Sequence, residues 1–319
     1  MLGTKKTTQK SVLGGIGVAL LLCLLMALMP MSGFVTNNVD DIDFVDATEE
    51  SEDFFKLPET IEETDYEYDQ ALELKGMRDQ MTKAYVTEDG KIAQLIANEP
   101  INYLLEDGVW DEIDLNIVAT ANGWEVTKNT FTAEFAEEVA GGVRVQTSQF
   151  VDPIITGINP TVVTIDESGE APMPLMVEPS NEGPTVGGNV IRYPVAEGFD
   201  LDYTVESSQL KQNLVIHERP VLQPNAAWLG VSEAVRLPAG YSLYIGETLL
   251  GEAITQTQEA LQVRHTETGE LLVEFPVPMV VEENAEAPYV ATYFVQAYGS
   301  LIVLTTAVDT DWLLSLIHI

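Results

Sequence analysis

The feature that most constrains the fold is a repeated pattern of short runs in which apolar and polar residues alternate, separated by Asp-Gly or Asn-Gly pairs. A period of two places every second side chain on one face, as in a β-strand with one buried face. Asp-Gly and Asn-Gly pairs allow the positive φ angles of tight hairpin turns. Beyond residue 33, no long segment has the period of a helix. The pattern therefore predicts an all-β protein.

The segment 99–115 is a clear example of such a hairpin. Its first half alternates around Tyr103, and the turn pair Asp-Gly ends at Gly108. We therefore expect Tyr103 to be largely buried. Trp110 has the wrong parity for the buried face of the returning strand. We expect either a bulge near Asp111 or a tryptophan that packs against the opposite face.

The segment 199–216 predicts a second hairpin, with the strongest strand of the chain. Four apolar side chains alternate with polar ones from Phe199 to Val205, and a returning strand follows from Leu210 to Ile216. Tyr203 lies in the middle of the apolar face, so we expect it to be largely buried.

Three polar residues of this hairpin form a candidate site. Asp200, Asp202 and His217 have the polar parity, so they can meet as an acid/base or metal-binding set. The simpler interpretation, which we favour, is that alternate strand positions face water. Phosphate-binding glycine loops, Gly-x-Ser-x-Gly and His-Glu-x-x-His are absent from the sequence. We therefore expect no catalytic, cofactor-binding or metal-binding residue.

The strands fall into two groups, which predict two β-sandwich-like modules. Proline and glycine accumulate between them, where only a strand over 161–165 is expected. The expected units are a first module at 80–152, a Pro/Gly-rich connection at 153–189 and a second module at 190–314.

Residues 1–33 have the pattern of a secretory leader. Three lysines, the last of them Lys10, precede an uncharged and mostly apolar run from Ser11 to Val39. Cleavage near Ser32 is expected, and a retained signal-anchor is the alternative because the run is almost long enough to span a bilayer. In both cases we expect the protein outside the cell or on its surface. The sole cysteine, Cys23, lies within this leader.

The charge of the chain is strongly acidic. Fifty-one acidic residues face 15 basic ones, a net charge of −36. This charge excludes nucleic acid as a partner and limits membrane contact to the leader. Residues 34–79 are expected to be a disordered acidic linker. Solvation is the simpler role for the acidity, and calcium binding at the run from Asp40 to Asp53 or at the strand aspartates is the alternative.

Several stretches between Arg78 and Leu313 resemble the N-terminal region of large secreted bacterial surface proteins, namely wall-associated and RHS-repeat proteins and related DNRLRE-domain proteins. The stretches are Arg78 with Thr82-Lys83, Glu88-Asp89-Gly90, Glu99-Pro100-Ile101-Asn102-Tyr103, Gly108-Val109-Trp110-Asp111-Glu112-Ile113-Asp114, Tyr193-Pro194, Gly198-Phe199-Asp200-Leu201-Asp202-Tyr203, Leu210-Lys211-Gln212, Pro278 and Asp311-Trp312-Leu313. The resemblance implies a non-enzymatic platform or stalk, with downstream domains of the same longer chain as partners. It implies no catalytic residue.

Two functions other than a platform are also considered: a binding module and, third in order, an enzyme. The alternative is a carbohydrate-binding accessory module of an exported hydrolase, with cell-wall or extracellular glycan as its partner. It requires exposed aromatic side chains aligned on one sheet face, for which Trp110, Trp124 and Trp228 are the candidates. Residues 315–319 are expected to be the non-native tail of a truncated fragment.

Overall fold

A computed structural model describes residues 18–20, 72–87, 91–147, 152–180, 182–282 and 288–316. Within these ranges the regular structure is mostly β-strand, with two 3₁₀ helices and a single α-helix, α1 (Thr310–Leu316). The all-β prediction is confirmed. The acidic run 40–53 and the turn 88–90 lie outside the described residues.

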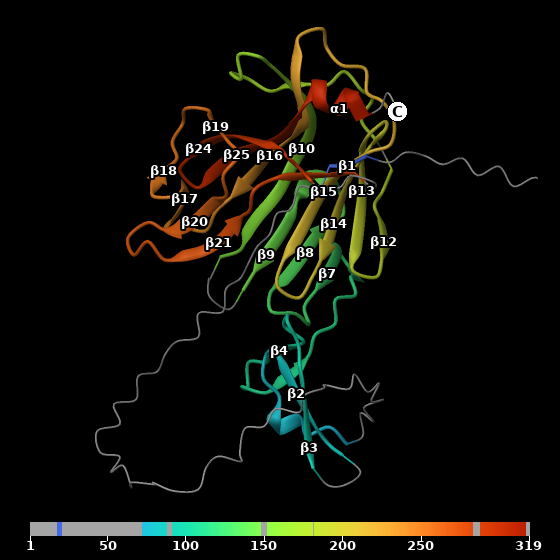
Figure 1. Ribbon diagram of the computed structural model, residues 1–319, viewed down its shortest axis with the longest axis vertical. Coiled ribbons are helices and arrows are strands. Elements are labelled where there is room, and N and C mark those ends of the chain that lie inside the picture. Colours follow the sequence, from blue (N-terminus) through green and yellow to red (C-terminus); the bar gives the residue numbers. More distant parts are fainter. Residues whose placement is uncertain are drawn as a thin grey trace, which may run out of the picture.

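Residues 72–114 form a small N-terminal lobe that projects from the rest of the molecule (Figure 1). The lobe consists of two antiparallel hairpins, each a two-stranded sheet. Its elements are η2 (Lys75–Met77), β2 (Thr82–Val86), β3 (Ile92–Ile96), β4 (Asn102–Leu104) and β5 (Trp110–Glu112). The described end of the expected linker, 72–79, belongs to this lobe.

The β4–β5 hairpin forms as the sequence predicts, but its buried side chain is a different one. Asn102 is fully buried, whereas Tyr103 has intermediate exposure, so Tyr103 is less buried than its neighbour and is not a fully buried residue of this hairpin. Pairing runs without a shift to Leu104 opposite Trp110. Trp110 therefore lies on the face opposite to Tyr103, and the hairpin has no bulge at Asp111. Two hairpins are too small to enclose a large apolar side chain on both faces.

The main body contains three sheets within the described ranges. The largest has ten strands in the order β19-β24-β25-β16-β10-β9-β8-β7-β6, and β11 also pairs with β10. Its strands are β6 (Val118–Thr120), β7 (Gly123–Val126), β8 (Thr132–Ala136), β9 (Val143–Gln146), β10 (Ile154–Asp166), β11 (Met173–Pro174), β16 (Ala226–Arg236), β19 (Thr255–Thr257), β24 (Thr292–Tyr298) and β25 (Leu301–Asp309). The 3₁₀ helix η3 (Val139–Gly141) connects β8 to β9.

The two smaller sheets of the described ranges have seven and four strands. The first has the order β12-β13-β14-β15-β1-β22-β23 and the second β18-β17-β20-β21. Their strands are β1 (Val18–Leu20), β12 (Thr185–Gly187), β13 (Val190–Ala196), β14 (Phe199–Val205), β15 (Leu210–Ile216), β22 (Met279–Glu282), β23 (Tyr289–Val290), β17 (Tyr241–Ile245), β18 (Thr248–Leu249), β20 (Leu261–His265) and β21 (Leu271–Phe275).

The prediction of a connection over 153–189 is wrong for its first part, because strand β10 occupies residues 154–166. This 13-residue strand pairs with β9 on one side and β16 on the other, so one continuous sheet crosses the boundary between the two expected modules. Pro160 lies in β10 where its register against β16 shifts. A proline cannot donate a ladder hydrogen bond, and such an irregularity accommodates it. Pro160 therefore marks an irregularity within a strand and not the start of a connection.

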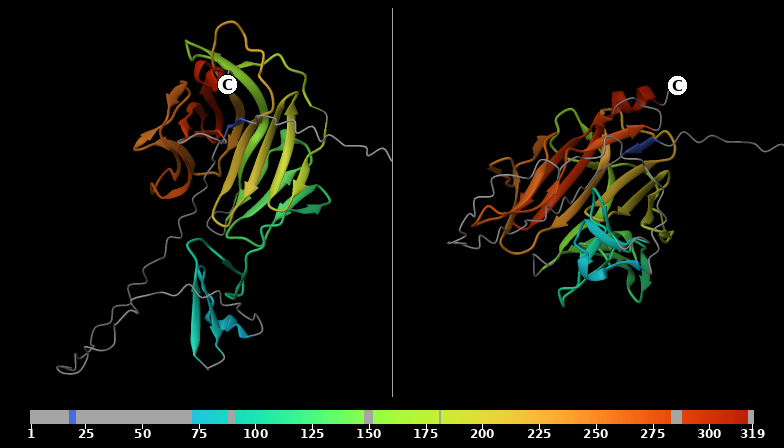
Figure 2. Two further views of the ribbon diagram at one scale, coloured as in Figure 1. Left: turned by 45° about the vertical axis from the view of Figure 1, so that its right-hand side comes forward. Right: turned by 60° about the horizontal axis from the view of Figure 1, so that its bottom comes forward.

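The main core lies between the sheets. One buried cluster contains side chains of all three, among them Phe135 of β8, Tyr203 of β14 and Val263 of β20. Strands β13–β15 pack across β7–β9 (Figure 2), where the Phe135 and Tyr203 ring centroids are 6.0 Å apart. Tyr203 is 1% exposed, so its predicted burial is confirmed.

The leader is described only at β1 (Val18–Leu20), which lies between β15 and β22. The expected signal helix is therefore not confirmed, and the rest of residues 1–33 lies outside the described residues. At the other end, α1 (Thr310–Leu316) includes the first two residues of the expected non-native tail, 315–319.

Candidate functional site

The candidate set of the second hairpin comes together only in part. His217 Nε2 lies 2.7 Å from Asp200 Oδ2 across the sheet. Asp202 does not join them, because both of its oxygens accept hydrogen bonds from Arg192, at 2.7 and 2.6 Å. Asp202 is buried and Arg192 is half-buried. The expectation that these positions simply face water is therefore wrong for Asp202.

This cross-strand ladder has the character of a structural ion pair. The hydrogen bonds to Asp202 raise the pKa of Arg192 further above its ordinary value. Arg192 Nε also lies 3.7 Å from Asp200 Oδ2, so it links the two aspartates. A bidentate arginine fixes carboxylates in one geometry. The ladder joins β13, β14 and β15.

The tryptophans do not align on one sheet face. Trp110 lies in the N-terminal lobe, and Trp124 of β7 packs against the main core. Trp228 of β16 belongs to a separate small cluster, where its ring centroid lies 5.2 Å from that of Phe294. A shared flat aromatic face is therefore absent for these three residues, and Trp228 by itself borders one of the cavities beside the turn 166–170.

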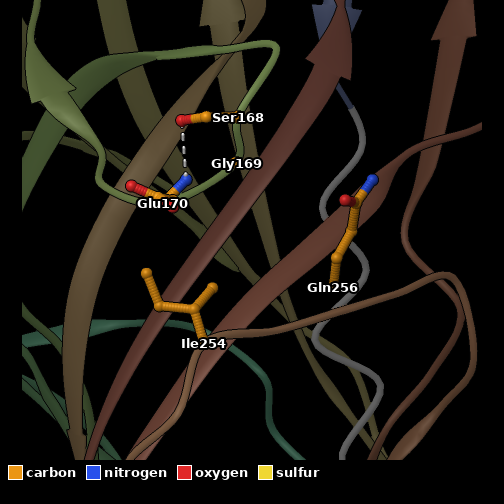
Figure 3. A pocket seen from close by; sticks show the side chains of 5 residues that line it. All are labelled: Ser168, Gly169, Glu170, Ile254 and Gln256. Atoms are coloured by element: carbon orange, nitrogen blue, oxygen red, sulfur yellow. Dashed lines mark hydrogen bonds between the residues drawn. The ribbon is translucent and has the colours of Figure 1, made fainter.

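Two cavities lie on either side of the turn 166–170. The larger, about 600 Å³, is bordered by Trp228, the turn and the start of α1. The smaller, about 370 Å³, is lined by the turn residues Ser168 to Glu170 together with Ile254 and Gln256 (Figure 3). Ser168 lines both cavities. We call them the paired cavities.

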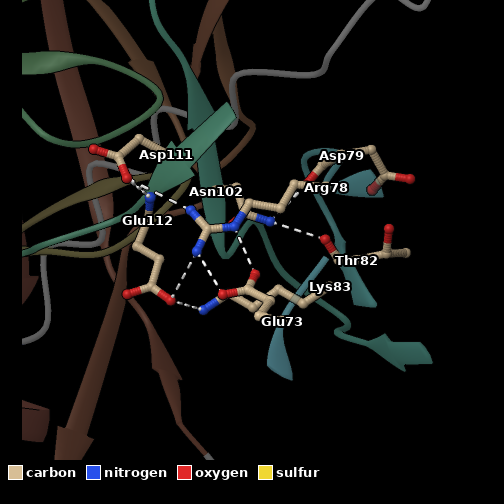
Figure 4. A network of polar contacts seen from close by, with 8 residues as sticks. All are labelled: Glu73, Arg78, Asp79, Thr82, Lys83, Asn102, Asp111 and Glu112. Atoms are coloured by element: carbon tan, nitrogen blue, oxygen red, sulfur yellow. Dashed lines mark hydrogen bonds and ion pairs between the residues drawn. The ribbon is translucent and has the colours of Figure 1, made fainter. Parts of the chain in front are cut away.

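A network of charged side chains holds the N-terminal lobe together (Figure 4). Arg78 donates from Nε and Nη2 to the two oxygens of Glu73, at 2.6 and 2.7 Å, and both side chains are buried. Arg78 also contacts Asp111 and Glu112 of β5. The hydrogen bond to Arg78 lowers the pKa of Glu73. One guanidinium thus ties the start of the lobe to its second hairpin.

Asn102 makes the second buried connection within the lobe. Its Nδ2 donates to the backbone carbonyls of Asp79, at 2.6 Å, and Thr82, at 3.0 Å. These bonds join β4 to the chain that enters β2. A buried amide that bonds backbone carbonyls fixes a fold because its loss would remove a hydrogen-bond partner from each of them.

A third buried polar cluster centres on Glu233 of β16, between the sheets. Oε1 accepts hydrogen bonds from the Thr156 hydroxyl, at 3.1 Å, and the Gly157 N–H, at 3.3 Å. Oε2 accepts one from Gln212 Nε2, at 2.6 Å, and the same nitrogen lies 3.3 Å from the Tyr203 hydroxyl. Burial raises the pKa of Glu233 and outweighs these hydrogen bonds, which lower it.

Sequence reasoning missed Glu233, although the strand carries a signal for it. Along β16 the buried positions include Leu229, Val231 and Val235, and Glu233 has the same parity. A charged residue on the apolar parity of a strand indicates a buried polar group. Gly157, with φ +67°, faces the Tyr203 hydroxyl so closely that a Cβ atom there would collide with it. This glycine therefore makes room for the cluster.

The described residues give no indication of a metal centre or a membrane span. In the ranges that the structure describes, no three His, Cys, Asp or Glu side chains are grouped to hold a metal ion. Nor does any helix in those ranges have the length and apolar character to cross a membrane. No protein-family model, curated protein or solved structure matches the chain.

Proposed function

We propose that this chain is the non-enzymatic N-terminal β-rich platform of a longer secreted, cell-surface protein of the RHS-repeat or wall-associated type, with β-sandwich-like packing. One observation carries the proposal: the stretches behind the resemblance contribute side chains to several of the buried hydrogen bonds. Arg78 and Asn102 hold the lobe, and Gln212 bonds Glu233 in the main body. Side chains committed to such bonds support a scaffold.

The proposed partners follow from this role. They are the downstream domains of the same longer chain and cell-wall or extracellular glycan. The membrane is contacted only through the leader, and the net charge of −36 disfavours nucleic acid.

Export of a C-terminally tagged chain tests the proposal. Because a basic segment precedes the apolar run, the tag is expected in the medium or the wall fraction, with an N-terminus near Phe34. Full-length protein in washed membranes would support the signal-anchor instead. Full-length protein that stays in the cytoplasm would contradict the platform role.

A carbohydrate-binding accessory module of an exported hydrolase is the second candidate function. The observation that favours it is the position of Trp228 beside the larger of the paired cavities. Indole rings commonly line saccharide sites because one ring face is apolar while the rim can be polar. Retention of the full chain on insoluble cellulose, chitin or xylan tests this function, and its passage through all three would contradict it.

A further inference from the structure

The paired cavities are built on one face of the ten-stranded sheet. Ile165, Trp228 and Asp309 are direct cross-strand neighbours on β10, β16 and β25, so their side chains form one row. Trp228 is half-buried and packs at 67° to the Phe294 ring. The sheet thus supplies a rigid floor with an aromatic side chain at the larger cavity.

The turn that separates the cavities is held in one conformation. Asp166 Oδ1 accepts hydrogen bonds from the Ser168 N–H, at 2.9 Å, and from the Ser168 hydroxyl, at 2.5 Å. Ser168 Oγ in turn accepts the Glu170 N–H, at 3.3 Å. Gly169 has φ +68° and lies against Phe294. The turn is therefore anchored both by its own hydrogen bonds and by the floor.

The opposite wall of the larger cavity is fixed as well. Asp309 Oδ1 accepts the Trp312 N–H, at 2.8 Å, and caps α1. The Thr310 hydroxyl donates to the Ala226 carbonyl, at 2.8 Å. Ligand sites are usually formed before the ligand arrives, and both walls meet that condition.

The lining of the larger cavity determines which ligand chemistry fits. Four carboxylates and the Asn225 amide border it, and among its described lining residues none is basic. An anionic ligand is therefore disfavoured. Within the described residues, no protein group bonds the side chains of Glu167, Asp311 or Asn225. Carboxylates accept hydrogen bonds, whereas an amide both donates and accepts, and hydroxyl groups match both kinds of partner.

We propose that the paired cavities bind a short neutral oligosaccharide, with one sugar ring beside Trp228 and ring hydroxyls that donate to Glu167 and Asp311. The inference rests on the carbohydrate-binding function and gives it a location. A sugar ring combines an apolar C–H face with a hydroxyl rim, which corresponds to an indole beside hydrogen-bond acceptors. The smaller cavity, beyond Ser168, receives the next part of the chain, where Gln256 offers an amide.

Calorimetric titration of the full chain tests the site. The probes are β-1,4-linked hexasaccharides of glucose, xylose, mannose and N-acetylglucosamine, with a glucosamine hexasaccharide as the cationic comparison. The test variant is Glu167→Ala with Asp311→Ala, which removes two exposed carboxylates and leaves the bonds of the turn and of α1 in place. The matched control, Glu137→Ala with Glu138→Ala, removes the same charge from exposed positions beside η3.

We expect one neutral hexasaccharide to bind the wild-type chain and the control equally. The test variant is expected to bind about a hundredfold more weakly, because two charge-assisted hydrogen bonds are lost at roughly tenfold each. Trp228→Ala, checked for an unchanged melting temperature, is expected to weaken binding similarly.

Three outcomes would overturn the proposal. Equal binding by wild type and the test variant would place the saccharide elsewhere while leaving the carbohydrate-binding function intact. Absence of binding by every neutral probe would contradict both the site and that function. Binding of the glucosamine hexasaccharide alone, lost at roughly 0.5 M salt where charges are screened, would show a cation site.

Discussion

Replacing Glu233 by glutamine removes a buried ionisable group and keeps its shape. The remaining Oε1 can still accept the hydrogen bonds of Thr156 and Gly157. The new amide would face Gln212 Nε2, which is itself a donor. Gln212 Oε1 is buried and has no hydrogen-bond partner among the described residues. A rotation of the Gln212 amide by half a turn therefore brings an acceptor to the new donor, and the variant is expected to fold.

The pH dependence of stability separates the variant from the wild type. Burial raises the pKa of Glu233 in the folded state above its value in the unfolded chain. The folded state then holds a proton that the unfolded state has lost, so stability is complete below the unfolded pKa, near 4.5. It falls as the pH rises towards the folded pKa, by at most about 1.4 kcal/mol per pH unit for one group. The glutamine variant lacks this decline.

The tyrosines near Glu233 do not contribute to the pH dependence of stability in this range. Burial raises the pKa of Tyr193 and Tyr203 above the ordinary value of 10.0, so both stay neutral from pH 4 to 8. Each strand that faces Glu233 contributes a neutral polar group: Thr156 from β10, Tyr203 from β14 and Gln212 from β15. The difference between wild type and variant therefore reports Glu233 alone.

Urea denaturation between pH 4.5 and 8 measures the difference. The Gln variant is expected to gain stability over the wild type steadily as the pH rises. A second variant, Glu233→Leu, leaves the buried Thr156 hydroxyl and Gly157 N–H without their acceptor and is expected to lose at least about 3 kcal/mol at pH 4.5. This deficit is expected to narrow as the pH rises, because only the wild type loses stability with increasing pH. Parallel stability curves for wild type and Glu233→Gln would refute the buried, proton-binding carboxyl.

Three further predictions follow from the same contacts. Tyr203→Asp is expected to unfold the main body, because an unpaired buried charge costs several kcal/mol, whereas Tyr103→Asp at a half-buried position is tolerated. Thermal melts followed by circular dichroism compare the two variants, and equal melting temperatures would contradict the difference in burial. Arg78→Lys loses the bidentate pair with Glu73 and is expected to destabilise the N-terminal lobe by about 1.5–3 kcal/mol. Amide hydrogen exchange in β2 and β4 measures this loss, and unchanged protection of those amides would argue against the network. Calcium is expected to raise the melting temperature no more than sodium at equal ionic strength; a calcium-specific rise of several degrees would reveal a bound ion.

Strand assignments were predictable where a strand has one buried face. Phe199–Val205 and Leu210–Ile216 form β14 and β15 with the boundaries that alternation indicates. Turn chemistry likewise predicted the β4–β5 hairpin. These features are local, because parity and positive-φ residues are properties of neighbouring positions along the chain.

Other features depended on partners distant in sequence. Strand β16 escaped prediction because its alternation is interrupted by Gly230 and by Glu233 on the buried face. Strand β10 contains a proline, which argues for a connection until the bulge against β16 is known. Both strands lie in the middle of the largest sheet, where each has partners on two sides.

The sequence by itself determined the strand class, the hairpin turns, the burial of Tyr203 and the acidic charge. Only the tertiary structure decided that Asp202 pairs with Arg192, that Asn102 is the buried residue of its hairpin and that Glu233 meets Gln212. Alternation states which side of a strand a residue occupies. It does not state which strand lies opposite, and the partner across the sheet or between sheets determines whether a polar side chain is solvated, paired or buried.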